Sequence, residues 1–385
     1  MRMRLACVVA LAAVVAAGCS GASPDTTPVV LGLINMEGAP QGSFPELRLD
    51  AEAAVRYVNR TRTRPLRLEA CVTDGTAESS ARCAEELVAR RPRPVAVLGG
   101  VDLGTDGSVP VLEGAGVPYV GLTPGLGAEL TSTSSFMLAG GITADLLAEI
   151  EYITATLKAA RVAVVHQELP GLQEAAVLAA QAILRQRGVT DLKTVPVKAG
   201  VADLAPAVRA AVANGPDALM AVFPADGCRR VLEAVRSLRV RAQVFLPSSC
   251  LAAEVLPAAE GAVLASTLTP YTFQSDADVA VYLAHRTADG PPSALGQAGF
   301  ALVVNVHRAL ARTGPPAALA ERLRAARDEP SFMGHPYTCD MRVITITPSV
   351  CSASVRLVQV SGGELRDLTG GQWVTGAPLV KLLTG

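Results

Sequence analysis

The stretch VAVLGGVDLGTDGSVPVLEGAGVPYVGLTPG, residues 95–125, contains two short apolar runs separated by a glycine-rich segment. The runs Val95–Gly100 and Val117–Leu122 have the length of buried strands, and each leads into residues that favour loops. Thr105 or Ser108 can cap a helix between the two runs. Because strands that alternate with helices are typical of an open parallel sheet, the stretch predicts an α/β fold.

The same alternation continues on both sides of this stretch. Before it, we expect strands at Val29–Asn35 and Leu66–Val72, and helices at Glu46–Asn59 and Ser79–Ala89. After Ala139, a second series is expected at helix Thr143–Ala159, strand Arg161–Gln167, helix Leu172–Gln186, strand Lys193–Val197, helix Asp203–Asn214, strand Asp217–Phe223, helix Cys228–Leu238 and strand Ala242–Ser248. Two similar series in tandem predict two lobes rather than one oversized sheet.

The last part of the chain departs from this alternation. A helix is expected at Leu295–Arg312. After Phe332 the pattern becomes β-like, and the segments Thr338–Cys351 and Val355–Leu368 are predicted to form strands and turns.

The N-terminus has the pattern of an export signal that ends at a cysteine. Two arginines and a short apolar run precede Gly18 and Cys19, and this run is too short to anchor a mature chain across a membrane. We therefore expect residues 1–18 to be a lipoprotein signal peptide, Cys19 to carry the lipid, and residues 19–28 to be a polar tether. Ala16 stands where Leu, Val or Ile is usual in lipoprotein signals. Ordinary secretory cleavage, with Cys19 an incidental thiol, therefore stays open.

Composition narrows the class of protein. Removal of residues 1–18 from the 385 leaves 32 basic and 35 acidic residues, so the mature chain is nearly balanced in charge. No cluster of basic residues interleaves with aromatic residues, which argues against nucleic-acid binding. Half of the chain is apolar, yet no stretch after the signal is long and uncharged enough to span a membrane.

Six cysteines beyond Cys7 and Cys19 agree with export. They permit 15 pairings, but they fall into three couples that are close in sequence. An oxidising compartment favours the disulfides Cys71–Cys83, Cys228–Cys250 and Cys339–Cys351, each of which would stabilise the fold by about 3 kcal/mol. Buried free thiols are the alternative. Zinc binding is disfavoured because no CxxC or HxxxH motif accompanies the cysteines.

The common signatures of enzymes are missing from the sequence. It contains no dinucleotide-binding GxGxxG, no phosphate-binding GxxxxGK[ST], no GxSxG and no HExxH. The four histidines are spread thinly, and we interpret them as structural or solvated side chains. His166, beside Gln167 and Glu168, is the best catalytic candidate, but no set of nucleophile, base and orienting group surrounds it. We therefore expect neither catalysis nor a cofactor nor a metal site.

The order of four segments carries a resemblance to a known family. DAEAAVRYVN (50–59), the stretch 95–125, RVAVVHQ (161–167) and DALMAVFPADGCRRVLEAVRSL (217–238) together resemble the branched-chain amino-acid type of ABC-transporter solute-binding protein, which has the type 1 periplasmic-binding fold. The likeness extends from about Val29 to about Leu368.

The resemblance implies two Rossmann-like lobes joined by three crossovers. The N-terminal lobe would contain residues 29–139 and about 268–354, and the C-terminal lobe residues 140–267 and about 355–385. The crossovers would fall near Leu138–Gly141, Ser266–Thr269 and Val355–Val360. The segment from Thr338 to Gly363 resembles family members that carry an added hairpin closed by a disulfide.

The resemblance also implies where a ligand binds, because open α/β sheets bind ligands beyond the carboxyl ends of their strands. In the N-terminal lobe, loops with glycines and hydroxyls after two strands would hold a ligand carboxylate. In the C-terminal lobe no acidic residue stands at Ser248, where the family commonly pairs a ligand ammonium, so Asp226 or Glu168 would have to replace it. The implied ligand-binding residues are Gly104, Thr105, Leu122, Thr123, Gln167, Asp226, Ser248 and Tyr271.

The function implied is that of an extracytoplasmic lipoprotein without catalytic activity. It would bind a small polar solute (an amino acid, an amide or a small carboxylate) and deliver it, as a monomer, to an ABC permease with its ATPase. Its anchor would be the lipid on Cys19. A ligand-sensing or scaffolding lipoprotein with the same fold is the alternative, which the missing carboxylate at Ser248 favours.

Overall fold

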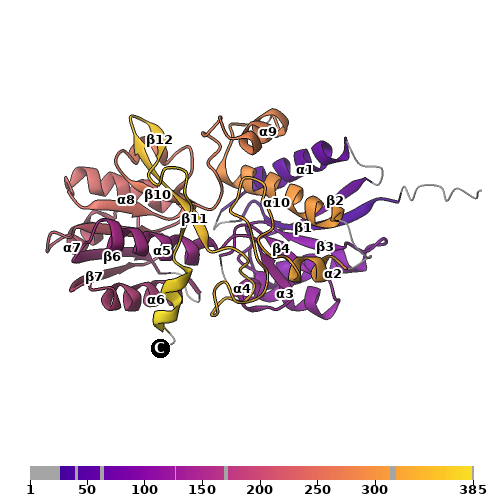
Figure 1. Cartoon of the computed structure of the whole chain (residues 1–385), viewed down its shortest axis with the longest axis horizontal. Coiled ribbons are helices and arrows are strands. Elements are labelled where there is room, and N and C mark those ends of the chain that lie inside the picture. The colour runs from indigo at the N-terminus through magenta and orange to yellow at the C-terminus, as the bar shows by residue number, and fades with distance from the viewer. Residues whose placement is uncertain are drawn as a thin grey trace, which may run out of the picture.

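The computed structural model describes residues 27–39, 42–60, 65–125, 127–168, 172–288, 290–312 and 318–383. The expected signal peptide, Cys19 and the tether as far as residue 26 lie outside this part of the chain. Two α/β lobes lie side by side, each with its own sheet (Figure 1). The predicted α/β class with two lobes is confirmed.

The sheet of the first lobe is parallel, with strand order β2-β1-β3-β4-β5. Its strands are β1 (Val29–Met36), β2 (Leu66–Thr73), β3 (Ala96–Gly99), β4 (Tyr119–Gly121) and β5 (Ser135–Met137). Every residue of β1 is buried, because helices cover both faces of the sheet.

Alternating side chains of β1 belong to different halves of the core. Leu31 and Leu33 pack with the helices α1 (Pro45–Asn59) and α10 (Ala294–Ala311), whereas Ile34 packs with α2 (Ala77–Ala89) and α3 (Thr105–Gly114). The first lobe is thus completed by a helix that comes from far along the chain, as Figure 1 shows beside α1. The remaining helices of this lobe are α4 (Ala128–Thr131), α9 (Ala277–His285) and α11 (Leu319–Arg324).

Short polar side chains mark the starts of several of these helices. The hydroxyl of Thr76 accepts a hydrogen bond from the backbone N–H of Ser79 at the start of α2. Ser293 accepts from the N–H of Gly296 at the start of α10, and Asp276 accepts two backbone N–H groups of α9. Each cap supplies a partner for a backbone donor that has none inside its helix.

The second lobe has a mixed sheet with strand order β12-β11-β10-β9-β8-β6-β7, in which β13 also pairs with β11. The strands from β10 back to β7 are parallel, and β11 and β12 are antiparallel to their neighbours. The strands are β6 (Arg161–Gln167), β7 (Asp191–Val197), β8 (Ala218–Val222), β9 (Gln243–Leu246), β10 (Val263–Ser266), β11 (Ser354–Ser361), β12 (Glu364–Asp367) and β13 (Val374–Thr375).

Helices cover both faces of this sheet as well, as the predicted series required. Val162 and Val164 of β6 pack toward α5 and α6, whereas Ala163 and Val165 pack toward α7 and α8. The helices are α5 (Gly141–Glu151), which continues as the π-turn η1 (Tyr152–Thr156), α6 (Leu172–Gln186), α7 (Ala205–Ala211), α8 (Ala225–Ser237), and the short 3₁₀ helices η2 (Ser248–Cys250), η3 (Leu256–Ala258) and η4 (Ala377–Leu383).

The chain passes between the sheets three times. It leaves β5 for α5, leaves β10 for α9, and returns from the first lobe into β11. The third passage precedes the position predicted for it: Val350 still bridges Met137 beside the first sheet, whereas Val355–Val360 already belong to β11.

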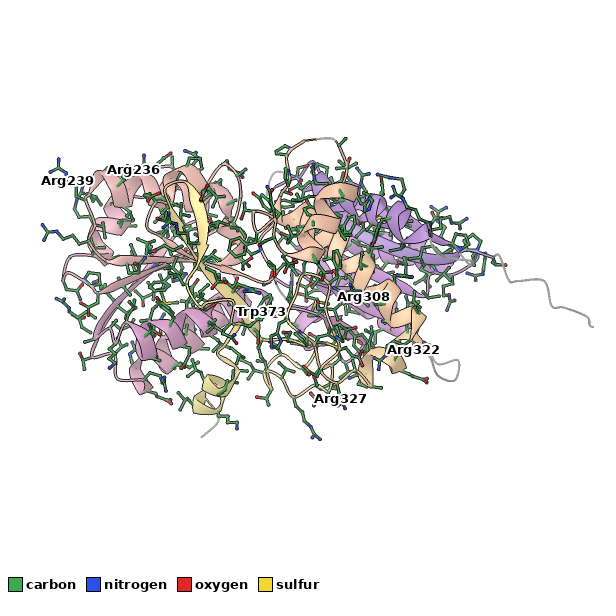
Figure 2. The ribbon with its side chains drawn as sticks, turned by 45° about the horizontal axis from the view of Figure 1, so that its top comes forward. Arg236, Arg239, Arg308, Arg322, Arg327 and Trp373 are labelled. Carbon is green, nitrogen blue, oxygen red and sulfur yellow. A yellow bond between two sulfur atoms is a disulfide. The ribbon has the colours of Figure 1, made fainter. Side chains whose placement is uncertain are left out.

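Trp373 lies near the middle of the molecule, where the centre of its ring is 5.7 Å from the centre of the His335 ring (Figure 2).

All three predicted disulfides are present. They join β2 to α2 (Cys71–Cys83), α8 to η2 (Cys228–Cys250), and the two ends of an irregular segment before β11 (Cys339–Cys351). The second of them ties together the segments that follow β8 and β9. No helix within the described ranges has both the length and the apolar character that crossing a membrane requires.

The prediction of strands within Thr338–Cys351 is wrong. The disulfide closes the segment, but apart from the single bridge at Val350 it contains only turns, such as those in which Thr347 N–H donates to Ile344 O and Val350 N–H donates to Thr347 O. Its alternating residues are strand-like, but β5, the nearest sheet edge, has only three residues and offers no longer ladder. The hairpin of this region is β11–β12, which lies almost wholly within Val355–Leu368, where strands and turns were predicted.

Candidate ligand-binding site

In both lobes, the loops that follow the carboxyl ends of the parallel strands lie where the lobes meet. Burial raises the pKa of Glu46, at the start of α1, and the negative charge of Glu254 from the other lobe raises it further. Gly141 at the start of α5 lies so close to the loop after β4 that a Cβ there would be 2.1 Å from the Pro124 oxygen. Since ligands of such sheets bind beyond the carboxyl ends of strands, these facing loops form the candidate site.

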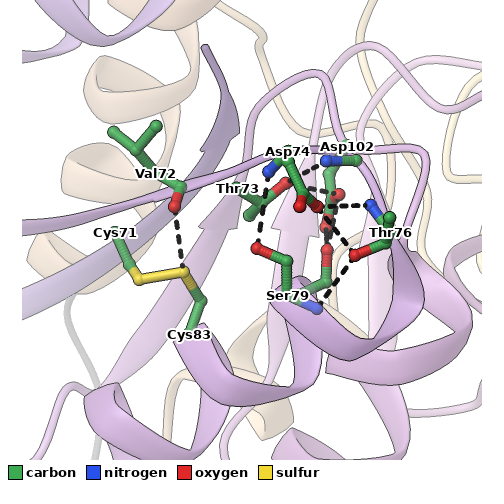
Figure 3. Close-up of a disulfide and its surroundings, with 10 residues drawn as sticks. Cys71, Val72, Thr73, Asp74, Thr76, Ser79, Cys83 and Asp102 are labelled. Carbon is green, nitrogen blue, oxygen red and sulfur yellow. Dashed lines mark hydrogen bonds between the residues drawn. A yellow bond between two sulfur atoms is a disulfide. The ribbon is translucent and has the colours of Figure 1, made fainter. Parts of the chain in front are cut away.

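The loop after β3 is held by a buried aspartate, Asp102, which was not among the predicted site residues. Asp102 accepts hydrogen bonds from Ser80 Oγ at 2.7 Å, from Thr73 Oγ1 at 3.3 Å and from the backbone N–H of Gly104 at 2.9 Å. Burial raises the pKa of Asp102, and the hydrogen bond from Ser80 opposes that shift. Figure 3 shows this cluster beside the Cys71–Cys83 disulfide.

Two of the predicted binding residues, Gly104 and Thr105, lie at the end of this loop. Both are buried, and the backbone N–H of Gly104 is already used by Asp102. A Cβ on Gly104 would lie 2.3 Å from both Ser80 Oγ and Thr76 O, so close packing against α2 accounts for the glycine. The carboxylate of Asp102 also makes this loop less suitable for an anion than its glycines alone predict.

The loop after β4 provides a hydroxyl that is not used inside the chain. Thr123 Oγ1 is buried and has no hydrogen-bond partner within the described ranges, whereas Leu122 beside it belongs to the hydrophobic core. The loop is fixed by Gly125 N–H, which donates to Glu129 at 2.7 Å. A buried hydroxyl without a partner is costly, so Thr123 is suited to donate to a ligand oxygen.

In the second lobe, the predicted residues after β6 and β8 have little to offer as a buried site. Gln167 ends β6 and is half-buried, and Glu168 after it is exposed. The side chain of Asp226 is 68% exposed and pairs with Arg230, one turn along α8, at 2.8 Å. Asp226 therefore lies on the surface, where its charge is already balanced by Arg230.

Ser248, two residues after the end of β9, is held by a carboxylate from another element. Its backbone N–H and its hydroxyl both donate to Asp145 Oδ2, at 2.9 and 2.6 Å. Asp145 lies on α5 and was not among the predicted site residues, because it precedes Ser248 by 103 residues and no local pattern links the two. Its only signal in the sequence was a carboxylate among the apolar residues of a predicted helix. Because Ser248 Oγ gives its proton to Asp145, it can only accept from a ligand.

Tyr271 and His166 are both buried and contact other parts of the protein. Tyr271 is 8% exposed and packs in the core of the first lobe, and burial followed by the charge of Glu254 raises the pKa of its hydroxyl. The ring nitrogen Nδ1 of His166 lies 3.2 Å from the backbone oxygen of Gln167. Within the ranges described, no group of His, Cys, Asp or Glu residues is arranged to hold a metal ion.

Two α/β lobes with facing loops at their strand ends are the arrangement found in bilobal binding proteins. The sequence profile of the family described as "Periplasmic binding protein" matches residues 28–363, and the chain belongs to this family. The predicted resemblance to the branched-chain amino-acid type is confirmed at the level of family and fold. No curated protein is matched by the sequence.

Several solved structures share the fold at low sequence identity. One is a possible leucine/isoleucine/valine-binding protein from Rhodopirellula baltica SH 1, which has a TM-score of 0.72 and 16% identity over 90% of this chain and 98% of the other. Another is the leucine-binding protein LivK from Thermotoga maritima MSB8, with a TM-score of 0.71 and 16% identity over 90% and 99%. A fatty acid ABC transporter substrate-binding protein from Thermomonospora curvata has a TM-score of 0.73 and 13% identity over 92% and 94%.

Proposed function

We propose that this protein is the extracytoplasmic solute-binding component of an ABC importer, anchored by a lipid on Cys19. It binds one small polar solute (an amino acid, an amide or a small carboxylate) between its lobes and has no catalytic activity of its own. The relatives with the same fold support a binding role, and they include a leucine-binding protein and a fatty acid ABC transporter substrate-binding protein.

One observation carries the choice of a small polar solute: the two lobes present complementary hydroxyls. Thr123 of the first lobe has a proton to donate and no acceptor in the described part of the chain. Ser248 of the second lobe has committed its proton to Asp145 and keeps its lone pairs. A solute with an acceptor oxygen at one end and an N–H donor at the other would satisfy both.

The division into two lobes allows the protein to close around a solute. We assign residues 29–139 and 268–354 to one lobe, residues 140–267 and 355–385 to the other, and residues 19–28 to the tether. A solute that contacts both lobes only when they approach each other would favour the closed form by the energy of those contacts. In the closed form the protein would be presented to the permease as a monomer.

Titration calorimetry on the purified mature protein tests the proposal. The panel contains L-amino acids, their amides, and the matched carboxylic acids without the amino group. We expect one saturable site per chain for at least one class of compound. Absence of heat and of thermal stabilisation across the whole panel would overturn the proposed ligand class.

Cellular uptake separates import from the alternative of sensing. Cells that lack the gene should lose high-affinity uptake of the labelled solute that calorimetry identifies, and should regain it when the gene is restored. Unchanged uptake together with tight binding would favour a sensing or scaffolding lipoprotein.

A further inference from the structure

Two carboxyl groups are buried together in α5, the helix that follows the first passage between the lobes. Asp145 is 1% exposed and Glu149 is 0% exposed. They are four residues apart on a continuous helix, so they lie one above the other on the same face.

The hydrogen bonds of this pair are incomplete. Asp145 Oδ2 accepts both donors of Ser248, but Asp145 Oδ1 and both carboxyl oxygens of Glu149 have no partner within the described ranges. Two ionised carboxylates so placed would repel each other and would leave three oxygens without donors. A single proton between them removes the repulsion and supplies one donor.

No described ion pair joins Asp145 or Glu149 to a charged side chain on the elements packed against α5, and no cation contributes to the pKa shift of either carboxyl. The titratable or charged side chains described on these elements are Arg161 and His166 on β6, Tyr152 on η1, Arg185 on α6, Arg356 on β11 and Lys381 on η4, and none stands on η2, β10 or β13. Arg356 pairs with Asp367 at 3.0 Å, and on α5 itself Glu151 pairs with Arg187 at 3.3 Å.

Burial and then the charge of Asp145 raise the pKa of Glu149 well above its usual value, and burial raises the pKa of Asp145 to about 6.

We propose that Glu149 keeps its proton at neutral pH and donates it to Asp145 Oδ1, so that Asp145 stays ionised and holds Ser248 as an acceptor for the ligand. Asp145 and Glu149 are then positioning residues that act through Ser248 and do not touch the ligand. The last step of this inference rests on the proposed function, because it is there that Ser248 meets a solute.

This arrangement should fail at acidic pH. As the pH falls through about 6, Asp145 gains a proton of its own and becomes a weaker acceptor for the N–H and hydroxyl of Ser248. The loop after β9 then loses its ionised anchor, whereas Glu149 remains neutral throughout.

The first test observes the proton directly and needs no ligand. Mature protein labelled with ¹³C at its glutamate side-chain carboxyls is titrated by NMR, together with the variants Glu149→Gln and Glu151→Gln. We expect one glutamate carboxyl to remain protonated at neutral pH, to disappear in Glu149→Gln, and to persist in the matched control Glu151→Gln on the same helix. If every glutamate is ionised at neutral pH, the inference is wrong.

The second test observes the positioning of Ser248, again in ligand-free protein. The chemical shift of the Ser248 amide should titrate with a midpoint near the pKa of Asp145. Glu149→Gln, which keeps an N–H donor, should leave this midpoint unchanged. Glu149→Leu, which removes the donor, should raise it by about one pH unit, as expected for the loss of one hydrogen bond to a charged group.

A purely structural role for Glu149 would give the same midpoint in all three proteins, and this outcome would overturn the positioning role. Glu149→Leu places an apolar side chain in a buried position and is therefore compatible with folding. Because neither test uses a ligand, the result is independent of whether the calorimetric panel contains the right solute.

Discussion

Asp102 and Asp145 each hold a loop that lies at the carboxyl end of a strand. Asp102 gathers the hydroxyls of Thr73 and Ser80 and the N–H of Gly104, and Asp145 takes both donors of Ser248. Both carboxylates therefore already accept hydrogen bonds from loop residues in the protein without a ligand. The groups left for a solute are neutral hydroxyls, which suits the proposed role of binding a solute and releasing it.

The hydroxyl of Thr123 should account for a large part of the affinity. We expect Thr123→Val, which keeps the shape and removes the donor, to weaken binding of a carboxylate-bearing solute about ten- to a hundredfold, as loss of a hydrogen bond to a charged group does. Titration calorimetry measures the change. The control is Thr131→Val on α4, whose exposed hydroxyl donates to Gly127 O instead. Equal affinity of Thr123→Val and wild type would remove Thr123 from the site.

The pH dependence of stability should reveal the buried Asp145. Its pKa is raised from 3.8 to about 6, so between these values the folded state holds a proton that the unfolded state has released. Its contribution is therefore most favourable at low pH and is lost as the pH rises through that window. The Asp145→Asn variant does not titrate there. We expect its unfolding free energy, relative to wild type, to rise by about 3 kcal/mol between about pH 4 and pH 7.

Denaturant unfolding at several pH values measures this difference. Asp217, which is exposed and paired with Arg161, provides the matched control: its pKa is lowered, chiefly by the hydrogen bond from Arg161, so Asp217→Asn should change stability in the opposite direction with pH. A difference between Asp145→Asn and wild type that does not vary with pH would contradict the raised pKa of Asp145.

The loop between β3 and α3 depends on one glycine for its fit against α2. A methyl group on Gly104 would lie 2.3 Å from Ser80 Oγ and Thr76 O, so Gly104→Ala must displace the start of α3 or of α2. We expect a loss of stability of about 1–3 kcal/mol, typical of overpacking. Gly125→Ala is the control, since nothing lies within 4 Å of its added methyl group. Thermal unfolding of the two variants should differ accordingly.

The regular strands and helices could be predicted because burial imposes a period on them. β6 and α6 have the predicted bounds, since a strand covered on both faces is continuously apolar and an amphipathic helix repeats every 3.6 residues. β10 was not predicted: four residues between turns carry no period. Thr338–Cys351 was predicted as strand because its alternation is real, but a strand also needs a neighbouring edge, which a local pattern does not contain.

The candidate site could be predicted only where it depends on loops after strands. The positions of Thr123 and Ser248 follow from that rule, and both have chemistry that suits a ligand. Asp145 could not be found in this way, because its contact with Ser248 spans 103 residues and depends on how α5 packs. The surface position of Asp226 likewise depends on its pairing with Arg230 along α8.

The chain passes between the lobes three times because late segments complete both of them. α10 covers the sheet of the first lobe, and β11 and β12 extend the sheet of the second, although all three come late in the sequence. Each lobe therefore includes segments from the last quarter of the chain. The Cys228–Cys250 disulfide then fixes the segments after β8 and β9 relative to each other, so that rigid lobes rather than mobile loops would meet around a solute.

The proposed lipid anchor should be separable from binding. Residues 19–28 lead into β1, and the candidate site lies on loops far along the chain from them, so Cys19→Ser should release the exported protein from the membrane fraction without changing its affinity for the solute. Labelled palmitate should be incorporated into wild type and into the control Cys7→Ser, but not into Cys19→Ser. Ala16→Leu, which restores the usual signal, should increase the lipidated fraction. Membrane-bound Cys19→Ser would show that another segment provides the anchor.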